Sequence, residues 1–415
     1  MKGRRAQRLA HRAVRRVALR CVRAVVVTSW RLRPRPAGGR PRVRVLLQHA
    51  YGTGGTIRTV LNVCGHLARD ADVEIVSVVR RRESAFFSLP PGVEISFADS
   101  GGGGWLAKLP SLLTPGEDAT FRAMSLYSDL RLVRALCRRT PDVLIGTRPS
   151  LNLLAAALTT RRVATIGQDH MNLPSYRPGL RAEIARCYGG LTVVTVLTER
   201  SRQDYEDLLT GTRTRVVRIP NALPVPPGNP SPRDRKTILA AGRLTRQKGF
   251  DLLLRAYEPL AREHPDWTLR IFGSGRKRAR LRAMITELGL EGRVELRPRT
   301  PDLPGEMVRS SIFVLSSRHE GMPMVVIEAM AKGLAVVAFD CPTGPGEMIT
   351  HRTDGLLVPP GDVARLTEAL RELIEDPGLR DRLGEGALVA SKAYDLDDIG
   401  PRWAALVAEP TTASG

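Results

Sequence analysis

Aromatic residues and cysteines are scarce in this chain of 415 residues. Aromatic residues make up 5% of it, and the cysteines form no C-x-x-C pair; they are Cys21, Cys64, Cys137, Cys187 and Cys341. A zinc site or a dithiol redox motif is therefore not expected, and an odd, unpatterned set of thiols is typical of a reducing compartment. The sequence has no apolar run long enough to cross a bilayer, and nothing in it indicates a signal peptide.

Acidic residues are missing from the beginning of the chain, where the first one is Asp70. Residues 1–220 hold 37 Lys and Arg against 16 Asp and Glu, whereas residues 221–415 hold 27 against 26. Nearly all of the net charge of +22 therefore belongs to the first half. An acidic partner is expected to bind that half.

Residues 1–40 form a basic extension before the first predicted strand. Arginines recur at near-helical spacing from Arg4 to Arg23, alanines and valines lie between them, and prolines follow Trp30. The pattern predicts a basic amphipathic helix, which we expect to lie on the anionic inner membrane surface through residues 1–33. The alternative is a disordered basic tail or a misassigned start codon. No nucleic-acid partner is expected, because the aromatic residues of a stacking platform are missing.

Short apolar runs alternate with helical patterns from residue 41 onward. A first series of predicted strands covers 43–48, 73–79, 143–146, 165–168 and 191–197, and a second series begins at 237–241 after a proline-rich break at 219–235. Such alternation predicts parallel sheets. We therefore expect an α/β fold with two Rossmann-like, doubly wound domains facing a cleft, over 41–220 and 221–395. Residues 396–415 are expected to form a helix that could cross back to the first domain.

The segment 315–330 gives the strongest evidence for a binding site. It reads LSSRHEGMPMVVIEAM and follows a predicted apolar strand. Gly321 allows a tight turn, and Pro323 suits the first position of the helix that follows. Free amides at that helix start would bind a diphosphate. Glu328 is the only charge in the apolar helix, and a buried carboxylate needs polar partners, for which a ligand hydroxyl pair is suited. Compensation of the helix dipole is the alternative role.

Glu320 and Glu328 are separated by seven residues within E-G-M-P-x-x-x-x-E-A-M, and this pattern resembles the hallmark of the retaining glycosyltransferase family four. The resemblance implies the two-domain GT-B fold and a reaction without a metal ion. It also implies that Glu328 binds the ribose of a nucleotide. Glu320, with the amides of Gly321 and Met322, would hold the donor sugar and the diphosphate.

Two further segments of the second predicted domain resemble the same family. Residues 242–249 read GRLTRQKG, similar to G-R-L-x-x-x-K-G, and residues 272–275 read FGSG, similar to its G-x-G turn with Gly273. The resemblance implies that Arg243, which follows Gly242, and Lys248 hold the diphosphate. Two cations would offset the charge that grows on a departing nucleoside diphosphate. Ordinary surface charge and a plain tight turn are the alternatives.

The first predicted domain contributes two candidate segments. Gly54 and Gly55 lie in YGTGGT between a strand and a helix, where glycines let a ligand approach the backbone. The loop resembles the family's glycine loop, which touches the donor phosphate and the acceptor. Gln168-Asp-His170 follows a strand and resembles the segment with the family's histidine near the reacting sugar. A structural role is the alternative for His170.

The resemblance covers residues 43–405 and implies a metal-independent, retaining hexosyltransferase. We expect transfer of a hexose or N-acetylhexosamine from a UDP-linked donor to a hydroxyl of an envelope glycan, a lipid-linked acceptor or a teichoic-type acceptor. The donor is a substrate, so no cofactor is expected, and a cytoplasmic protein at the inner face of the membrane is predicted. The alternatives are a nucleotide-sugar epimerase and a non-catalytic, basic protein that binds membranes or nucleic acid. The predicted catalytic residues are Glu320, His170, Arg243 and Lys248, and the predicted donor contacts are Gly54, Gly55, Gly242, Gly273, Gly321, Met322 and Glu328.

Overall fold

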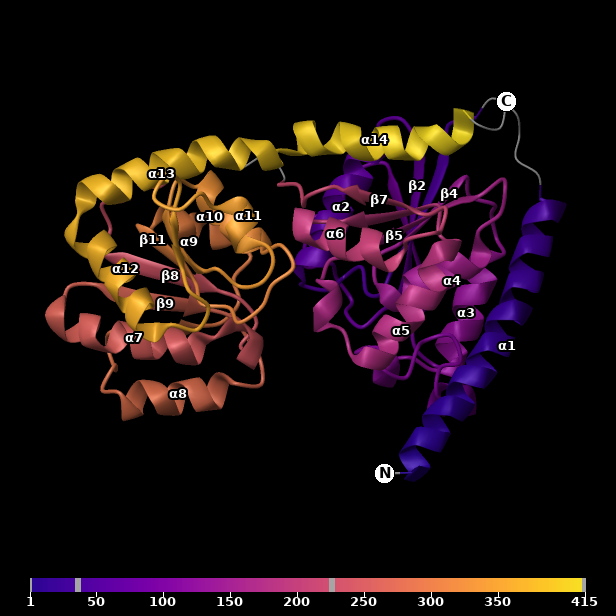
Figure 1. The fold of residues 1–415 in the computed structure, drawn as a ribbon, viewed down its shortest axis with the longest axis horizontal. Helices are drawn as coiled ribbons and strands as arrows, with labels where there is room; N and C mark the ends of the chain where they lie inside the picture. Colours follow the sequence, from indigo (N-terminus) through magenta and orange to yellow (C-terminus); the bar gives the residue numbers. More distant parts are fainter. Residues whose placement is uncertain (1, 34–38, 224–227, 413–415) are drawn as a thin grey trace. The chain divides into compact units, whose positions relative to one another are not determined.

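The computed structural model describes residues 2–33, 39–223 and 228–412, and the chain divides into two compact units (Figure 1). Unit 1 comprises residues 1–222 and 399–415, and unit 2 comprises residues 223–398. The basic extension therefore groups with unit 1, as does the greater part of the C-terminal helix α14 (Leu396–Thr412). Part of the predicted linker, residues 224–227, lies outside the described residues.

Unit 1 is built on a parallel sheet in the order β3-β2-β1-β4-β5-β6-β7. Its strands are β1 (Arg42–Leu47), β2 (Asp72–Val79), β3 (Val93–Asp99), β4 (Val143–Gly146), β5 (Ala164–Gln168), β6 (Val193–Val196) and β7 (Arg215–Arg218). The helices between them are α2 (Gly55–Leu67), α3 (Leu126–Leu136), α4 (Pro149–Leu158), α5 (Pro178–Cys187) and α6 (Glu199–Leu208). Because the strand order reverses between β1 and β4, ligands are expected at the carboxyl ends of these strands.

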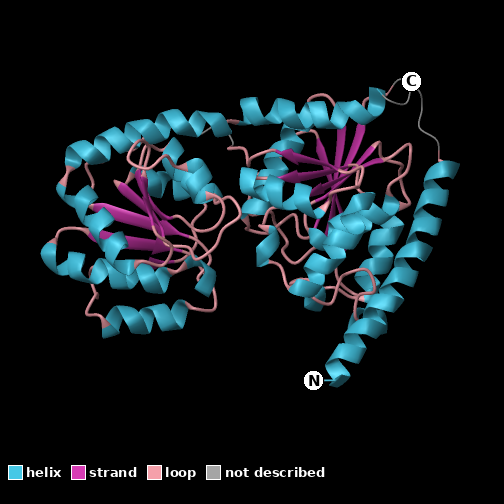
Figure 2. Cartoon of the chain, in the orientation of Figure 1, coloured by secondary structure: helices cyan, strands magenta, loops and turns pink. Residues whose placement is uncertain are grey.

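Unit 2 repeats this architecture with a sheet in the order β10-β9-β8-β11-β12-β13. Its strands are β8 (Thr237–Ala241), β9 (Thr268–Phe272), β10 (Val294–Arg297), β11 (Ile312–Leu315), β12 (Ala335–Phe339) and β13 (Leu356–Val358). Its helices are α7 (Phe250–Glu263), α8 (Arg278–Glu287), α9 (Leu303–Val308), α10 (Met324–Ala331), α11 (Pro345–Met348), α12 (Val363–Glu375) and α13 (Pro377–Ser391). Figure 2 shows helices around each sheet. The strand order of unit 2 reverses between β8 and β11.

The strands β3 and β7 were not predicted from the sequence, and both stand at the ends of the first sheet. Edge strands carry charged residues that blunt their free hydrogen-bonding edge. Arg215 and Arg218 enclose the two valines of β7, and its burial is only partial. A search for continuous apolar runs therefore misses these strands, whereas the inner strands are buried throughout or nearly so.

The N-terminal residues form the helix α1 (Lys2–Leu32), which packs against α3 and α4 of unit 1. Val26 is fully buried, and Trp30 is buried and donates from Nε1 to the carbonyl oxygen of Leu136 at 2.8 Å. Arg15 is also buried and forms an ion pair with Glu183 at 2.5 Å. The prediction of a helix is confirmed, and the alternative of a disordered tail is wrong. One side of this helix belongs to the core of unit 1.

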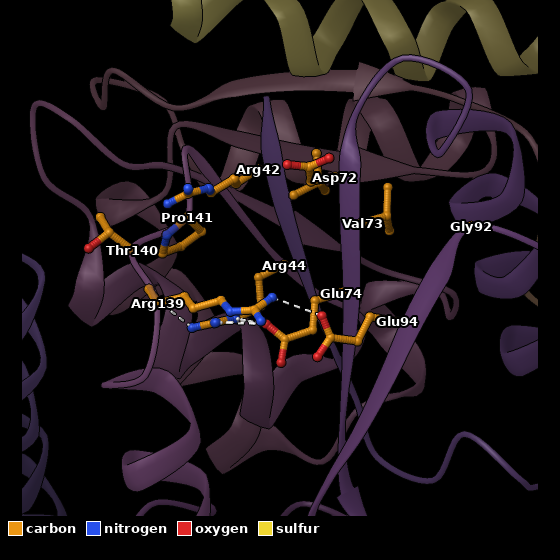
Figure 3. A pocket seen from close by; sticks show the side chains of 11 residues that line it. Arg42, Arg44, Asp72, Val73, Glu74, Gly92, Glu94, Arg139, Thr140 and Pro141 are labelled. Carbon is orange, nitrogen blue, oxygen red and sulfur yellow. Dashed lines mark hydrogen bonds and ion pairs between the residues drawn. The ribbon is translucent and has the colours of Figure 1, made fainter. Parts of the chain in front are cut away.

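A hollow of about 370 Å³ lies at the amino ends of β1, β2 and β3 (Figure 3). Arg44 is 2% exposed there and donates from Nη2 to Glu74 at 2.7 Å. Its Nη1 donates to the carbonyl oxygens of Leu136 and Arg139. Arg139 in turn pairs with Glu94 at 2.8 Å. Arg44 and Arg139 are thus each paired with a carboxylate, which is the condition for burying the guanidinium group of Arg44.

No helix among the described residues combines the length and the apolar character that are needed to cross a bilayer. This statement also holds for the basic helix α1, which is described from Lys2 onward.

Replacing Trp30 by alanine tests whether α1 is an integral part of unit 1. We expect Trp30→Ala to lower the free energy of unfolding by about 3 kcal/mol, because a buried indole and its hydrogen bond are lost. Val25 lies on the same helix and is 56% exposed, so Val25→Ala should change the stability by less than about 0.5 kcal/mol. Urea denaturation followed by circular dichroism measures both. Equal stability of the two variants would contradict the packing of α1.

Candidate active site

The predicted donor-binding residues of unit 2 gather where the strand order reverses. Lys248 lies in the loop after β8, and Glu320 lies in the loop after β11, which pairs directly with β8. Both loops leave the carboxyl ends of parallel strands, where open α/β sheets bind ligands. The tertiary structure thus brings together two charged residues that are 72 positions apart in the sequence.

Lys248 and Glu320 form an ion pair with 2.5 Å between Nζ and Oε1. Their side chains are 13% and 8% exposed, so both charges are largely removed from solvent. An ammonium group has three donors, and an ionised carboxylate has several acceptor positions. The pair can therefore hold its geometry and still bind further polar groups of a ligand.

The loop of Lys248 packs directly on the loop of Glu320 through Gly249. Gly249 has φ +62°, and a Cβ atom at this position would stand 1.9 Å from the carbonyl oxygen of Ser316. The Ser316 hydroxyl donates to the carbonyl oxygen of Lys248 at 3.0 Å. Only glycine fits both the backbone conformation and the close approach. The glycine that follows Lys248 thereby sets the separation of the two loops.

Side chains that were not predicted from the sequence hold these two loops together. Arg318 donates to both carboxylate oxygens of Asp251 at 2.8 and 2.7 Å. This hydrogen-bonded fork lowers the pKa of Asp251. Gln247 donates from Nε2 to the carbonyl oxygen of His319 at 3.0 Å. Bidentate pairs of this kind fix orientation as well as distance.

The loop after β12 supports the Glu320 segment from the other side. Thr343 donates from its hydroxyl to the carbonyl oxygen of Glu320 at 2.5 Å. Gly344 has φ +93°, and a Cβ atom there would lie 2.5 Å from the carbonyl oxygen of Gly321. Gly321 and Met322 are both buried in this packing. Thr343 was missed as a supporting residue, although it stands inside the segment D-C-P-T-G-P-G-E of residues 340–347.

The helix α10 begins one residue later than predicted, because Pro323 is its N-cap with φ −74° and ψ 102°. The expectation that Pro323 occupies the first helical position is therefore wrong. Glu328 is 9% exposed in the middle of α10, among side chains that are almost all buried. It takes part in an interaction within the protein, so the carboxylate is not isolated there. Its predicted contact with a ribose remains a prediction.

Arg243 and Gly273 occupy neighbouring loops at the same edge of the sheet. A Cβ atom on Gly273 would stand 2.0 Å from the carbonyl oxygen of Gly242, so the loops after β8 and β9 pack backbone against backbone. Arg243 is exposed and its guanidinium group lies 3.5 Å from Oε1 of Gln247. Its charge is therefore accessible beside the pair formed by Lys248 and Glu320.

Unit 1 places its candidate residues at the carboxyl edge of its own sheet. Gly54 is the N-cap of α2 and Gly55 is the first residue of that helix. The guanidinium group of Arg80 lies 5.6 Å from the ring centre of Tyr51, which belongs to the same glycine loop. A helix start with free amides and a nearby cation is suited to an anion.

His170 follows β5 and is half-buried, and its Nε2 atom has no hydrogen-bond partner among the described residues. Burial lowers the pKa of His170 to about 4, so the imidazole is neutral at pH 7. A neutral imidazole can donate or accept one hydrogen bond through Nε2, depending on its tautomer. Because Nε2 is itself buried, the contact of His170 with a sugar hydroxyl stays a prediction.

Asp169, the neighbour of His170, is the most strongly constrained carboxylate in this part of unit 1. It is 1% exposed and accepts hydrogen bonds from the hydroxyls of Tyr176 and Tyr205 and from the amide of Met171. Burial raises its pKa, and the two tyrosine hydroxyls oppose this shift. The residue was not predicted to matter. These hydrogen bonds fix the backbone on which His170 stands.

No cluster of three metal-binding side chains occurs in the described parts of the chain. The predicted residues of unit 2 meet at one edge of its sheet, and those of unit 1 at the corresponding edge of the other sheet. Backbone amides and cationic side chains at such an edge are suited to an oxyanion.

The comparison with known families agrees with this assignment of unit 2. Residues 225–388 match the family model of the glycosyl transferases group 1. This range contains β8 to α12 and most of α13, and with them Lys248, Glu320 and Glu328. Residues 225–388 are thus similar to the glycosyl transferases group 1, and a glycosyltransferase is the class of protein that this part of the chain resembles.

Two curated relatives cover most of the chain. An exopolysaccharide phosphotransferase of Streptomyces coelicolor is 37% identical over 89% of the chain, but the chain spans only 41% of the length of that protein. An uncharacterized glycosyltransferase of Haemophilus influenzae is 29% identical over 87% of the chain and 98% of its own length. Similarity to glycosyltransferases therefore extends through both units.

A solved structure of similar architecture is Anabaena HepE in complex with UDP-glucose. It is 19% identical and covers 89% of this chain and 100% of its own, with a TM-score of 0.69. The parallel sheets of the two units share the order 3-2-1-4-5-6, to which unit 1 adds β7. This topology and the likeness to HepE confirm the predicted α/β fold of the two-domain GT-B type.

The neutral imidazole of the half-buried His170 makes the stability of unit 1 depend on pH. The lowered pKa means that the unfolded chain binds more protons than the folded chain between pH 6.5 and about 4. Stability should therefore fall as the pH falls through this window. We expect the wild type to lose about 1–2 kcal/mol more than His170→Gln between pH 7.5 and pH 5. Urea unfolding at both pH values measures this difference, and parallel losses would contradict it.

Proposed function

We propose that this chain is a retaining glycosyltransferase that moves a hexose or N-acetylhexosamine from a UDP-linked donor to a hydroxyl of an envelope glycan. The proposal rests on the ion pair of Lys248 and Glu320 at the reversal point of the second sheet, inside the segment that matches the glycosyl transferases group 1. Glu328 lies in the helix that follows the same loop and would bind the ribose of the nucleotide.

The charges of unit 2 suit the bond that breaks in such a transfer. The bond between the sugar C1 and the diphosphate oxygen breaks, and its electron pair stays on the diphosphate. Lys248, which is largely removed from solvent, and the exposed Arg243 offset this charge as preorganised donors. Glu320 holds Lys248 in place and can bind a hydroxyl of the donor sugar.

The acceptor completes the reaction on the same face of the sugar. A new bond forms between the acceptor oxygen and C1, and the hydroxyl proton passes to the departing diphosphate. Retention of configuration follows from this same-face attack, and the reaction needs no protein nucleophile. His170 is neutral at pH 7 and would hold a sugar hydroxyl rather than carry charge.

The proposed substrates are supported by what the similar proteins bind or make. Anabaena HepE was solved with UDP-glucose, and the relative from Streptomyces coelicolor is named for exopolysaccharide phosphotransfer. We therefore favour a UDP-linked donor and an envelope polysaccharide acceptor, with lipid-linked and teichoic-type glycans as the related acceptors to test.

We also propose that the enzyme works at the inner membrane surface, to which α1 would bind by its outward side. Val14, Val17 and Val25 are 49%, 59% and 56% exposed, and Arg16 and Arg20 are exposed beside them. The helix contains no acidic residue. Exposed apolar side chains together with unpaired positive charge favour an anionic bilayer.

Replacing Lys248 tests the assignment of the donor site. We expect Lys248→Ala to lower the rate of transfer at least about 100-fold and to weaken UDP binding, because a preorganised cation is lost. Lys236→Ala is the matched control, since Lys236 pairs with Asp266 just before the opposite end of the same strand β8. The control should retain transfer within about twofold.

Transfer is measured as UDP release in the presence and absence of a glycan acceptor. Retained activity in Lys248→Ala, with the control equally active, would contradict the site. Conversion of the donor to another sugar without any acceptor would indicate the epimerase instead.

Removal of divalent metal ions tests the proposed chemistry independently of any substitution. We expect transfer to continue within about twofold after EDTA treatment, because Lys248 and Arg243 provide the positive charge that a metal ion supplies in other transferases. The initial rate is measured before and after chelation, and again after Mg²⁺ or Mn²⁺ is restored. A strict requirement for Mn²⁺ would count against the proposed mechanism.

A further inference from the structure

A second hollow of unit 1 lies between α1 and the loops that precede β4 and β5, and its volume is about 520 Å³. Four arginines and two threonines line it together with three apolar residues. They are Arg23, Arg31, Arg161, Arg162, Thr140, Thr160, Val27, Trp30 and Val163. No acidic residue belongs to this lining. The hollow in Figure 3 differs in this respect, because Glu74 and Glu94 line it and pair with Arg44 and Arg139.

The four guanidinium groups of this hollow form no ion pair within the parts of the chain that the structure describes. Arg23 donates from Nη1 to the carbonyl oxygens of Ala157 and Thr159 at 2.5 and 3.0 Å, which positions it at the C-terminal end of α4. Thr160 accepts from the amides of Arg162 and Val163 at 3.2 and 3.0 Å. The backbone of the loop is thus ordered by its own hydrogen bonds, while positive charge gathers without compensation. Such a cluster attracts phosphate-type anions.

The apolar residues of the lining indicate that the ligand also has an apolar part. Trp30 donates from its ring nitrogen to Leu136, so the indole is held in place and its remaining surface forms part of the lining. Val27 and Val163 lie beside it. On the same helix, Leu32 is 76% exposed and Val25 is 56% exposed. A ligand with a charged phosphate and an apolar chain matches this combination better than a free anion does.

The hollow lies at the opposite edge of the sheet from the candidate site residues of unit 1. Thr140 precedes β4, and residues 160–163 precede β5, so the hollow lies at the amino edge of the sheet. Gly54 and His170 follow β1 and β5 and therefore lie at the carboxyl edge. A ligand in this hollow is thus bound at a distance from the proposed transfer, and its function is attachment.

We infer that the hollow formed by Arg23, Arg31, Arg161 and Arg162 binds the phosphate headgroup of an anionic membrane lipid. This inference deepens the proposed membrane association of α1 and rests on it. The guanidinium groups hold the phosphate, and the apolar lining with the exposed side chains of α1 contacts the start of the acyl chains. The helix α1, itself packed into the core of unit 1, then fixes that unit on the bilayer.

The test compares two double variants of the full chain that each remove two positive charges. Arg161→Gln/Arg162→Gln changes the lining of the hollow. Arg181→Gln/Arg213→Gln changes exposed arginines of unit 1 that do not line it. Binding is measured by sedimentation with phosphatidylcholine vesicles that contain or lack phosphatidylglycerol. Titrations with soluble short-chain phosphatidylglycerol and with inorganic phosphate distinguish the lipid headgroup from a free anion.

We expect the Arg161→Gln/Arg162→Gln variant to bind the anionic vesicles and the short-chain lipid at least about tenfold more weakly than the wild type. The Arg181→Gln/Arg213→Gln variant should lose less than about threefold. Equal losses in both variants would overturn the inference, because they would indicate diffuse attraction by net charge. Inorganic phosphate that binds as tightly as the short-chain lipid would overturn the lipid as the ligand.

Transfer to a soluble acceptor separates this inference from the proposed function. Both double variants should retain the wild-type rate, since neither changes a residue at the carboxyl edge of a sheet. If the wild type shows no transfer, the proposed function fails, and the vesicle measurements still decide the lipid site. A loss of transfer to a soluble acceptor in the Arg161→Gln/Arg162→Gln variant alone would contradict a role in attachment only.

Discussion

The contact between Lys248 and Glu320 depends on how closely the loops of the second sheet approach one another. Three glycines, Gly249, Gly273 and Gly344, stand where a Cβ atom would lie within about 2.5 Å of a backbone oxygen of a neighbouring loop. The loops therefore pack backbone against backbone at the carboxyl edge of the sheet. This packing brings a cation and a carboxylate together in a nearly dry setting, where electrostatic interactions are stronger than in water.

The two units share the same architecture but differ in the distribution of their charge. Unit 2 has balanced charge and concentrates its polar groups at one edge, which suits the binding of a nucleotide diphosphate. Unit 1 carries the excess of positive charge, and much of it lies on α1 and the loops beside that helix. Because α1 shares the core of unit 1 through Val26 and Trp30, its charges are held in fixed positions. A fixed cluster of cations can select a ligand, which a disordered basic tail does poorly.

Much of the fold could be read from the sequence, since buried parallel strands appear as short apolar runs. The strands β4 and β8 were predicted with the observed bounds, and β1, β2 and β5 within one residue of them. The edge strands β3 and β7 were missed, because their charged and half-exposed residues break the apolar pattern. The start of α10 was predicted one residue early, because proline is common at the first helical position, whereas Pro323 has an extended backbone and precedes the helix.

The sequence by itself determined the class of fold, the two-unit organisation and the residues most suited to bind a diphosphate, because these features depend on local pattern and on motif spacing. Only the tertiary structure decided which of those residues meet. It paired Lys248 with Glu320, supported that pair with Arg318, Asp251 and Thr343, and fixed the His170 segment through Asp169. It also gathered Arg23, Arg31, Arg161 and Arg162 around one hollow. Such contacts join residues far apart in the chain, and their geometry follows from the packing of strands and loops.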